Sequence, residues 1–165
     1  MSRAPHAAVR RGGLAALVAV GAAALGAVAC DYPAGQVDVP PGDPTVFRDQ
    51  VYPVLLRDCA FSGCHGNPDR FFTVYGPART RLDPTTDMDA PVTAEELAET
   101  YTRARSMLIS PSGIKRSPLL RKPLAVAAGG AGHRGTDPWG AAPYASKSDP
   151  SYQVLVGWAL AGGGQ

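Results

Sequence analysis

Large aromatic side chains are scarce in this 165-residue chain, at 7% of the sequence. Much of the other apolar content is alanine near the N-terminus, which fills little volume. Glycine and proline number 19 and 16, and both disfavour regular helices and strands. Such a chain is too small for a large enzyme barrel or several domains. A small, loop-rich domain is marginal on apolar burial alone, which favours an added disulfide, metal or covalent cofactor.

The chain also lacks an uninterrupted apolar run of the roughly 20 residues that a membrane-spanning helix needs. Residues 1–29 hold three arginines and no acid, and Gly21 and Gly26 interrupt their apolar part. This pattern is typical of a cleaved export signal. Its end, Ala27-Val28-Ala29-Cys30, resembles the lipobox of bacterial lipoproteins, which implies lipidation of Cys30 and a membrane anchor. The alternative is ordinary cleavage nearby, which leaves Cys30 as a free or paired thiol.

Either processing route places the domain outside the cytoplasm. The lipobox resemblance implies a lipid-anchored protein of the cell envelope that faces the periplasm or the cell surface. We expect residues 30–44 to form a flexible tether, residues 45–162 to form the domain, and residues 163–165 to form a short tail. Removing residues 1–29 leaves 13 Lys and Arg against 14 Asp and Glu, so the apparent basicity disappears. Nucleic acid, which needs a basic face, is therefore excluded as a partner.

Besides Cys30, two cysteines remain after this cleavage, Cys59 and Cys64. In an oxidising compartment they form a disulfide, attach a cofactor covalently or bind a metal. The segment reads Cys59-Ala60-Phe61-Ser62-Gly63-Cys64-His65. Two thiols followed directly by an imidazole is the arrangement that attaches haem c, since the thiols add across the two vinyl groups and His65 then binds iron from one face.

The motif resembles that of c-type cytochromes, and more narrowly of the small cytochrome c domain lipoproteins found in myxobacteria and related bacteria. The resemblance covers residues 45–162. Besides the motif it rests on Phe47, Val51, Pro53, Leu55, Gly66, residues 117–124 and 129–133, Tyr152, Leu155 and Trp158. It implies a mostly α, small cytochrome c-like helical domain with long Gly- and Pro-rich loops, whose first and last helices cross. It further implies covalent haem c on Cys59, Cys64 and His65, and a monomer that passes electrons to redox partner proteins without enzymatic activity.

The motif departs from the common haem motif because four residues, rather than two, separate the cysteines. The alternative is a Cys59–Cys64 disulfide, with His65 on the surface, in a haem-free envelope lipoprotein that acts as a binding or structural module. Zinc is a further candidate, since Cys59, Cys64, His65 and His133 formally make a Cys2His2 set. Adjacent residues such as Cys64 and His65 rarely both reach one tetrahedral ion, which argues against zinc.

Three side chains are candidates for the second axial ligand of the iron: His133, Met107 and Met88. His133 lies in a glycine-rich loop whose backbone can approach a flat macrocycle closely, and it is the only other histidine left after cleavage. Met107 falls inside a predicted helix, where methionine is more often a core residue. Met88 lies between two aspartates. We expect His65 and His133 to be the iron ligands; an open or water-bound position is the remaining alternative.

Three helices are predicted around this motif. The first, over residues 45–57, is kinked or restarts at Pro53. The second is capped by Thr93, with Glu96 completing a capping box, and ends before residue 110. The third begins near Asp149-Pro150 and ends at residues 162–164. Their expected buried faces are, in order, Phe47, Val51, Val54 and Leu55; Leu97, Tyr101, Ala104 and Leu108; and Tyr152, Leu155, Val156 and Ala159, with Trp158 toward the edge.

A long loop is predicted over residues 66–92, which contain several prolines and no apolar period. Its apolar cluster, which we expect to plug the core rather than to cover a haem, is Phe71, Phe72, Val74 and Tyr75. Residues 83–99 hold six carboxylates, whereas residues 101–136 hold seven cations and no acid. The basic stretch is typical of a solvated face. Around an exposed haem edge it would instead pair with propionates or steer an acidic redox partner.

Overall fold

The computed structural model describes residues 42–133 and 142–161. The chain divides into residues 1–36 and 37–165, and every described residue belongs to the second unit. The predicted signal peptide, Cys30, most of the tether and the short tail therefore lie outside the described residues. No helix in the described ranges is both long enough and apolar enough to cross a membrane.

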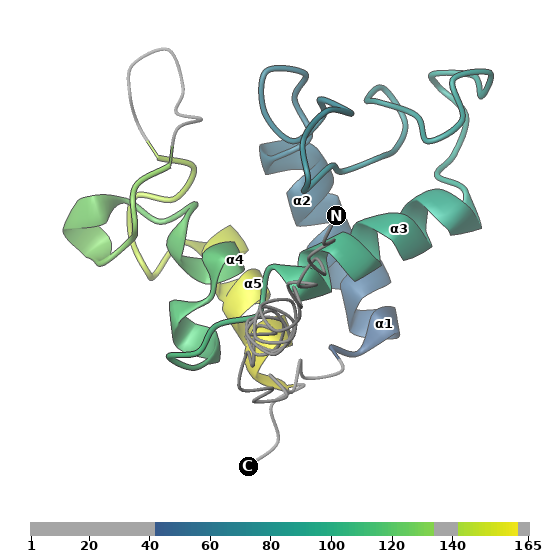
Figure 1. Ribbon diagram of the computed structural model, residues 1–165. Coiled ribbons are helices and arrows are strands. Elements are labelled where there is room, and N and C mark those ends of the chain that lie inside the picture. Colours follow the sequence, from purple (N-terminus) through teal and green to yellow (C-terminus); the bar gives the residue numbers. More distant parts are fainter. Residues whose placement is uncertain (1–41, 134–141, 162–165) are drawn as a thin grey trace, which may run out of the picture. The chain divides into compact units, whose positions relative to one another are not determined.

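The domain is mostly α, as predicted, and its helices are short apart from two (Figure 1). Over the described ranges the only β structure is an isolated parallel bridge between Leu124 and Tyr144. The elements are α1 (Pro44–Val46), η1 (Phe47–Val51), α2 (Tyr52–Asp58), α3 (Ala94–Ser106), η2 (Ile114–Arg116), α4 (Pro118–Arg121), η3 (Val126–Ala128) and α5 (Pro150–Ala161). The sequence analysis missed η2, α4 and η3, because three or four residues hold no full apolar period.

The first predicted helix is one continuous segment that changes its hydrogen-bonding pattern halfway. Asp43 caps its start, with Oδ1 accepting from the backbone N–H of Thr45 at 2.7 Å and of Val46 at 3.0 Å. The middle, η1, is a π-helical turn in which the N–H of Tyr52 donates to the carbonyl of Phe47. This turn ends just before Pro53, which has no N–H and whose ring clashes with the fourth preceding carbonyl in a regular α-helix. The interruption expected at Pro53 is therefore confirmed.

An aromatic cluster joins the first segment to α3 and α5. The ring centre of Phe47 lies 5.2 Å from that of Tyr101 and 5.2 Å from that of Trp158. Trp158 is 1% exposed, and its Nε1–H donates to the carbonyl of Asp43 at 3.1 Å. The prediction that Trp158 lies toward the edge of α5 is wrong, and Val156 is only half-buried. A β-carbon on Gly42 would lie 2.5 Å from the Trp158 ring, so glycine is needed for this close approach.

Helix α3 has the predicted capping box, and Ala104 and Leu108 of the expected face are buried, but two polar residues are buried as well. The hydroxyl of Thr93 accepts from the N–H of Glu96 at 3.1 Å, and the Glu96 carboxylate accepts from the N–H of Thr93 at 3.0 Å. Glu96, Thr100 and Ala104 are buried, whereas Leu97 and Tyr101 of the expected apolar face are half-buried. Apolar periodicity missed Glu96 and Thr100 because both are polar.

A buried ion pair explains why a carboxylate occupies the core side of α3. The guanidinium of Arg81 donates to both carboxylate oxygens of Glu96 at 2.8 Å, and the two side chains are 2% and 1% exposed. Arg81 also donates to the carbonyls of Asp87, Ala90 and Pro91. One cation thus fastens the irregular segment before α3 to the first turn of that helix.

Replacement of Arg81 tests this account. Arg81→Met leaves the buried Glu96 carboxylate without its cation, and we expect the free energy of unfolding in urea to fall by about 3–5 kcal/mol at pH 7. Burial raises the pKa of Glu96, but hydrogen bonds from Arg81, Thr93 and Leu82 outweigh it and hold that pKa below its usual value. The ion pair therefore stabilises above the pKa of unfolded Glu, about 4.3, and the difference between the proteins narrows as the pH falls below it.

The control is Arg48→Met, which removes an exposed cation from its pair with Asp49. Because exposed pairs contribute little, this change costs about 0–1 kcal/mol. Equal losses in the two variants would contradict the role given to Arg81.

Candidate cofactor site

A cavity of about 540 Å³ lies beside the C-terminal end of α2. Its volume falls within the roughly 300–1,000 Å³ of small-molecule and cofactor sites. Its walls come from every part of the domain: Leu55, Asp58, Cys59, Cys64, His65, Arg70, Phe71, Phe72, Met107, Pro118, Leu119, Lys122, Pro123, His133, Pro143 and Leu155. Both cysteines and both histidines singled out from the sequence are among them, so the fold brings these four side chains to one space.

The turn after α2 brings the motif residues together despite the two additional residues between the cysteines. The N–H of His65 donates to the carbonyl of Cys59 at 2.9 Å, and the N–H of Cys64 donates to the carbonyl of Phe61 at 2.8 Å. Residues 61–63 are exposed, so the additional length projects into solvent. Directly after His65, a β-carbon on Gly66 would overlap the carbonyl of Ala60. Only glycine permits this turn.

Both thiols are free and partly buried. Burial, with a smaller effect of the neighbouring Asp58, raises the pKa of Cys59 to about 12. Cys59 is therefore a neutral thiol at physiological pH, and a weak nucleophile unless a base activates it.

The imidazole of His65 is oriented by the loop that follows it. Its Nδ1 lies 2.6 Å from the carbonyl oxygen of Phe72. Because a carbonyl only accepts, Nδ1 carries the proton and Nε2 keeps its lone pair free. Burial lowers the pKa of His65 and outweighs the opposite effect of the Phe72 bond. A neutral imidazole with one nitrogen held by a backbone carbonyl is the usual state of a metal-binding histidine.

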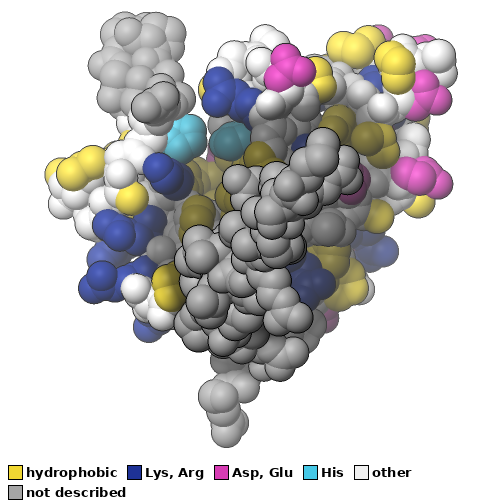
Figure 2. Space-filling view, in the orientation of Figure 1, with side chains coloured by type: hydrophobic (Ala, Val, Ile, Leu, Met, Phe, Trp, Pro, Cys, Tyr) yellow, Lys and Arg dark blue, Asp and Glu magenta, His cyan; other side chains and the backbone are white. Residues whose placement is uncertain are grey.

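The second imidazole, that of His133, lies next to the first. The ring centres of His65 and His133 are 5.8 Å apart and the planes are inclined by 56°; Figure 2 shows the two histidines side by side. A metal-bound imidazole nitrogen lies roughly 2 Å from the metal and about 1 Å from its ring centre, so rings at this separation would be close enough for one metal ion to bind both.

The glycines before His133 are required by the backbone. Gly129 and Gly132 have φ angles of 94° and 71°, which lie in the left-handed region that favours glycine. A β-carbon on Gly130 would overlap the carbonyl of Leu124. The loop thereby folds back tightly and brings His133 to the cavity wall.

The two candidate methionines lie in different places. Met107, the C-terminal cap of α3, lines the cavity. Met88 is 54% exposed and does not line it. The expected apolar plug also divides: Phe72, Val74 and Tyr75 are buried, whereas Phe71 lines the cavity but is 71% exposed.

A polar network that the sequence analysis missed fastens the Cys59 end of α2. The hydroxyl of Tyr144 donates to Oδ2 of Asp58 at 3.1 Å, and the guanidinium of Arg57 donates to both Asp58 oxygens and to the hydroxyl of Ser151. Burial, followed by the nearby Cys59 and Asp58, raises the pKa of Tyr144, so this phenol is a neutral donor. No short motif marks the network, because Asp58 and Tyr144 are far apart in the sequence.

Among residues 42–133 and 142–161, no three His, Cys, Asp or Glu side chains are arranged to hold a metal ion by themselves. The cavity presents instead two imidazoles and two thiols on largely apolar walls. This donor set is compatible with a metal tetrapyrrole, in which the ring nitrogens supply the remaining metal ligands.

The chain matches no protein-family model, no curated protein and no solved structure.

The Asp58 network predicts a measurable effect of Tyr144→Phe. This change removes a hydrogen bond to a carboxylate, so we expect the free energy of unfolding in urea to fall by about 1–3 kcal/mol. The matched control is Tyr152→Phe, since the Tyr152 hydroxyl has no hydrogen-bond partner among the described residues; it should change stability by less than about 0.5 kcal/mol. Equal effects would show that the Tyr144–Asp58 bond does not stabilise this wall.

Proposed function

We propose that this chain is a monohaem c-type cytochrome lipoprotein that carries single electrons in the cell envelope. The observation that carries the proposal is the convergence of Cys59, Cys64, His65 and His133 on one largely apolar cavity, with the two imidazole centres 5.8 Å apart. A haem bound there supplies one-electron Fe(III)/Fe(II) chemistry.

Cys59 and Cys64 would hold the cofactor through thioethers. Each thiol adds across one vinyl group: a C–S bond forms, the thiol hydrogen passes to the other vinyl carbon, and no oxidant or reductant is consumed. The high pKa of the Cys59 thiol means that this addition needs an activating base. Export followed by attachment through dedicated maturation machinery meets that need.

His65 and His133 would bind the iron. His65 is held by the Phe72 carbonyl with Nε2 free, as a metal-binding histidine requires. The ring centre of His133 lies 5.8 Å from that of His65. Two imidazoles give a lower reduction potential than one imidazole and one thioether. With both positions filled, no site remains for a substrate on the iron, which supports an electron carrier rather than an enzyme.

The apolar walls give the cofactor its environment. Leu55, Leu119 and Leu155 are each at most 5% exposed and come from α2, α4 and α5. Such walls would lower the polarity around a bound cofactor. A bound cofactor would also supply apolar contacts that a chain with few aromatics lacks. Lipidation of Cys30 would tether the domain to the membrane.

Covalent attachment is tested on protein exported from cells that contain the cytochrome maturation machinery. We expect the intact mass to exceed that of the processed chain by one haem, and a pyridine haemochrome spectrum of the c type. Cys64→Ser should lose most of the covalently loaded protein. A colourless wild-type protein with a Cys59–Cys64 disulfide would refute the proposal and favour the haem-free binding or structural module.

The distal ligand is tested by His133→Ala. Loss of the second imidazole should convert the six-coordinate, low-spin spectrum of the oxidised protein to a high-spin one while the haem stays attached. Met107→Leu is the control, because Met107 also lines the cavity. The substitution removes the thioether sulfur and keeps an apolar side chain of similar volume. If Met107→Leu, and not His133→Ala, changes the spin state, His133 is not the ligand.

A further inference from the structure

We propose that Arg103 is a positioning residue for His65, because it holds the loop whose Phe72 carbonyl orients the His65 imidazole. This inference rests on the proposed function and assigns to that site a residue that does not touch the cofactor. Arg103 lies in the last turn of α3 and does not line the cavity. It would therefore act on His65 only through the loop that follows the cysteine motif.

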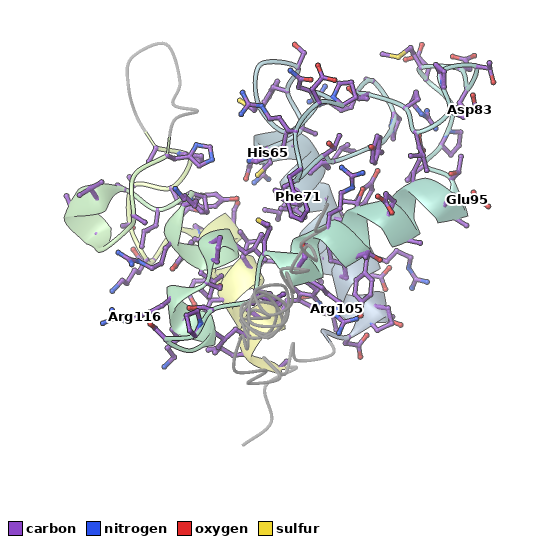
Figure 3. The ribbon with its side chains drawn as sticks, in the orientation of Figure 1. His65, Phe71, Asp83, Glu95, Arg105 and Arg116 are labelled. Carbon is purple, nitrogen blue, oxygen red and sulfur yellow. The ribbon has the colours of Figure 1, made fainter. Side chains whose placement is uncertain are left out.

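The guanidinium of Arg103 is directed at this loop. Its Nη1 donates to the carbonyl of Phe71 and to the hydroxyl oxygen of Thr73, both at 3.1 Å, with a longer bond of 3.4 Å to the carbonyl of Arg70. The side chain is 26% exposed, so Arg103 departs from the solvated face expected for the basic stretch. Figure 3 shows the labelled Phe71 beside the C-terminal half of α3, in agreement with these contacts.

Two neighbouring side chains fix the direction of the guanidinium. Its Nε donates to Oε1 of Glu99, one turn earlier on α3, at 2.7 Å. Its central carbon lies 5.5 Å from the ring centre of Tyr75. Because the guanidinium is planar and its donors point in fixed directions, a bond at Nε also determines where Nη1 points. Glu99 and Tyr75 thus aim Nη1 of Arg103 at the loop.

Thr73 connects this contact to the backbone of the loop. Its side chain is fully buried, and its hydroxyl accepts from Arg103 and donates to the carbonyl of Arg70 at 2.7 Å. The N–H of the next residue, Val74, donates to the carbonyl of His65 at 2.7 Å. The loop is therefore tied to α3 through Arg103 and to the motif through His65.

The carbonyl of Phe72 lies between these contacts along the chain. It accepts from Nδ1 of His65 at 2.6 Å. Arg103 binds the carbonyl of the residue before Phe72 and the side chain of the residue after it. Because peptide groups are planar and the backbone rotates about only two bonds per residue, fixing both neighbours restricts rotation of the Phe72 carbonyl. Arg103 thereby keeps this carbonyl directed at His65.

The strength of the Phe72 bond affects the electron density of the imidazole. A carbonyl that accepts strongly from Nδ1–H raises the basicity of Nε2, and a more basic ligand favours the oxidised state of a metal. Loss of Arg103 should weaken this bond and raise the reduction potential. Loss of a nearby positive charge acts in the opposite direction, because a cation disfavours the more highly charged oxidised iron. The sign of the change therefore separates positioning from a simple effect of charge.

The first experiment measures the reduction potential of the holoprotein in two test variants and two controls. Arg103→Met removes the donor, and Thr73→Val removes the hydroxyl that accepts from it without a change of charge. We expect each to raise the equilibrium constant for reduction roughly three- to tenfold, which for a one-electron couple is about 30–60 mV. The controls should change it by less than about twofold. They are Arg48→Met, an exposed cation that does not line the cavity, and Thr102→Val, whose hydroxyl donates to the carbonyl of Ala98 within α3.

The second experiment follows the Nδ1 proton of His65 itself. Its exchange with D2O is measured by NMR in the reduced, diamagnetic holoprotein. We expect exchange to be roughly three- to tenfold faster in Arg103→Met and in Thr73→Val, because the hydrogen bond that protects the proton is weakened. Either test variant decides the question if the other yields no folded protein. A lower potential in Arg103→Met, or unchanged potential and exchange in Thr73→Val, would overturn the proposal.

The two proposals fail separately. A protein without covalent haem refutes the cytochrome function when the mass is measured. In that haem-free chain the imidazole ¹⁵N shifts still report which nitrogen of His65 carries the proton. A proton on Nδ1 in the wild type and a mixture of both tautomers in Arg103→Met would support the role of Arg103, whereas the same tautomer in both proteins would overturn it. A holoprotein whose test variants match the wild type refutes that role and leaves the cytochrome function standing.

Discussion

The apolar cavity at the end of α2 is the constraint on which the rest of the domain depends. Leucines from α2, α4 and α5 face it, yet they do not fill it. Any molecule that binds only the folded state stabilises it. A chain with so few aromatic residues therefore gains most from a large, flat, apolar ligand in this space, which is what the proposed haem would supply.

Two polar arrangements fasten irregular parts of the chain to helices. The buried pair of Arg81 and Glu96 fastens the irregular segment before α3 to that helix. Tyr144 and the exposed Arg57 hold Asp58, which lies beside Cys59 at the end of α2. Between these two arrangements the chain can remain largely irregular, because buried hydrogen bonds and ion pairs of specific geometry replace the missing apolar contacts.

Much of the fold could be predicted where the cause is local. The capping box of Thr93, the interruption before Pro53 and the start of α5 after Asp149 each depend on a few neighbouring residues. Predictions failed where the cause lies far along the chain. Trp158 is buried because Phe47 and Tyr101 pack against it, and Glu96 is buried because Arg81 pairs with it. The apolar pattern within one helix does not show which distant residues pack against that helix.

The candidate site divides in the same way. The sequence by itself determined which groups are candidates for holding a cofactor, since Cys59, Cys64 and His65 are close along the chain and few other metal-binding residues remain. Only the tertiary structure decided that His133 lies next to His65 and that Met107 rather than Met88 reaches the cavity. The physical reason is that bond geometry acts over neighbouring residues, whereas distances between remote residues follow from packing of the whole domain.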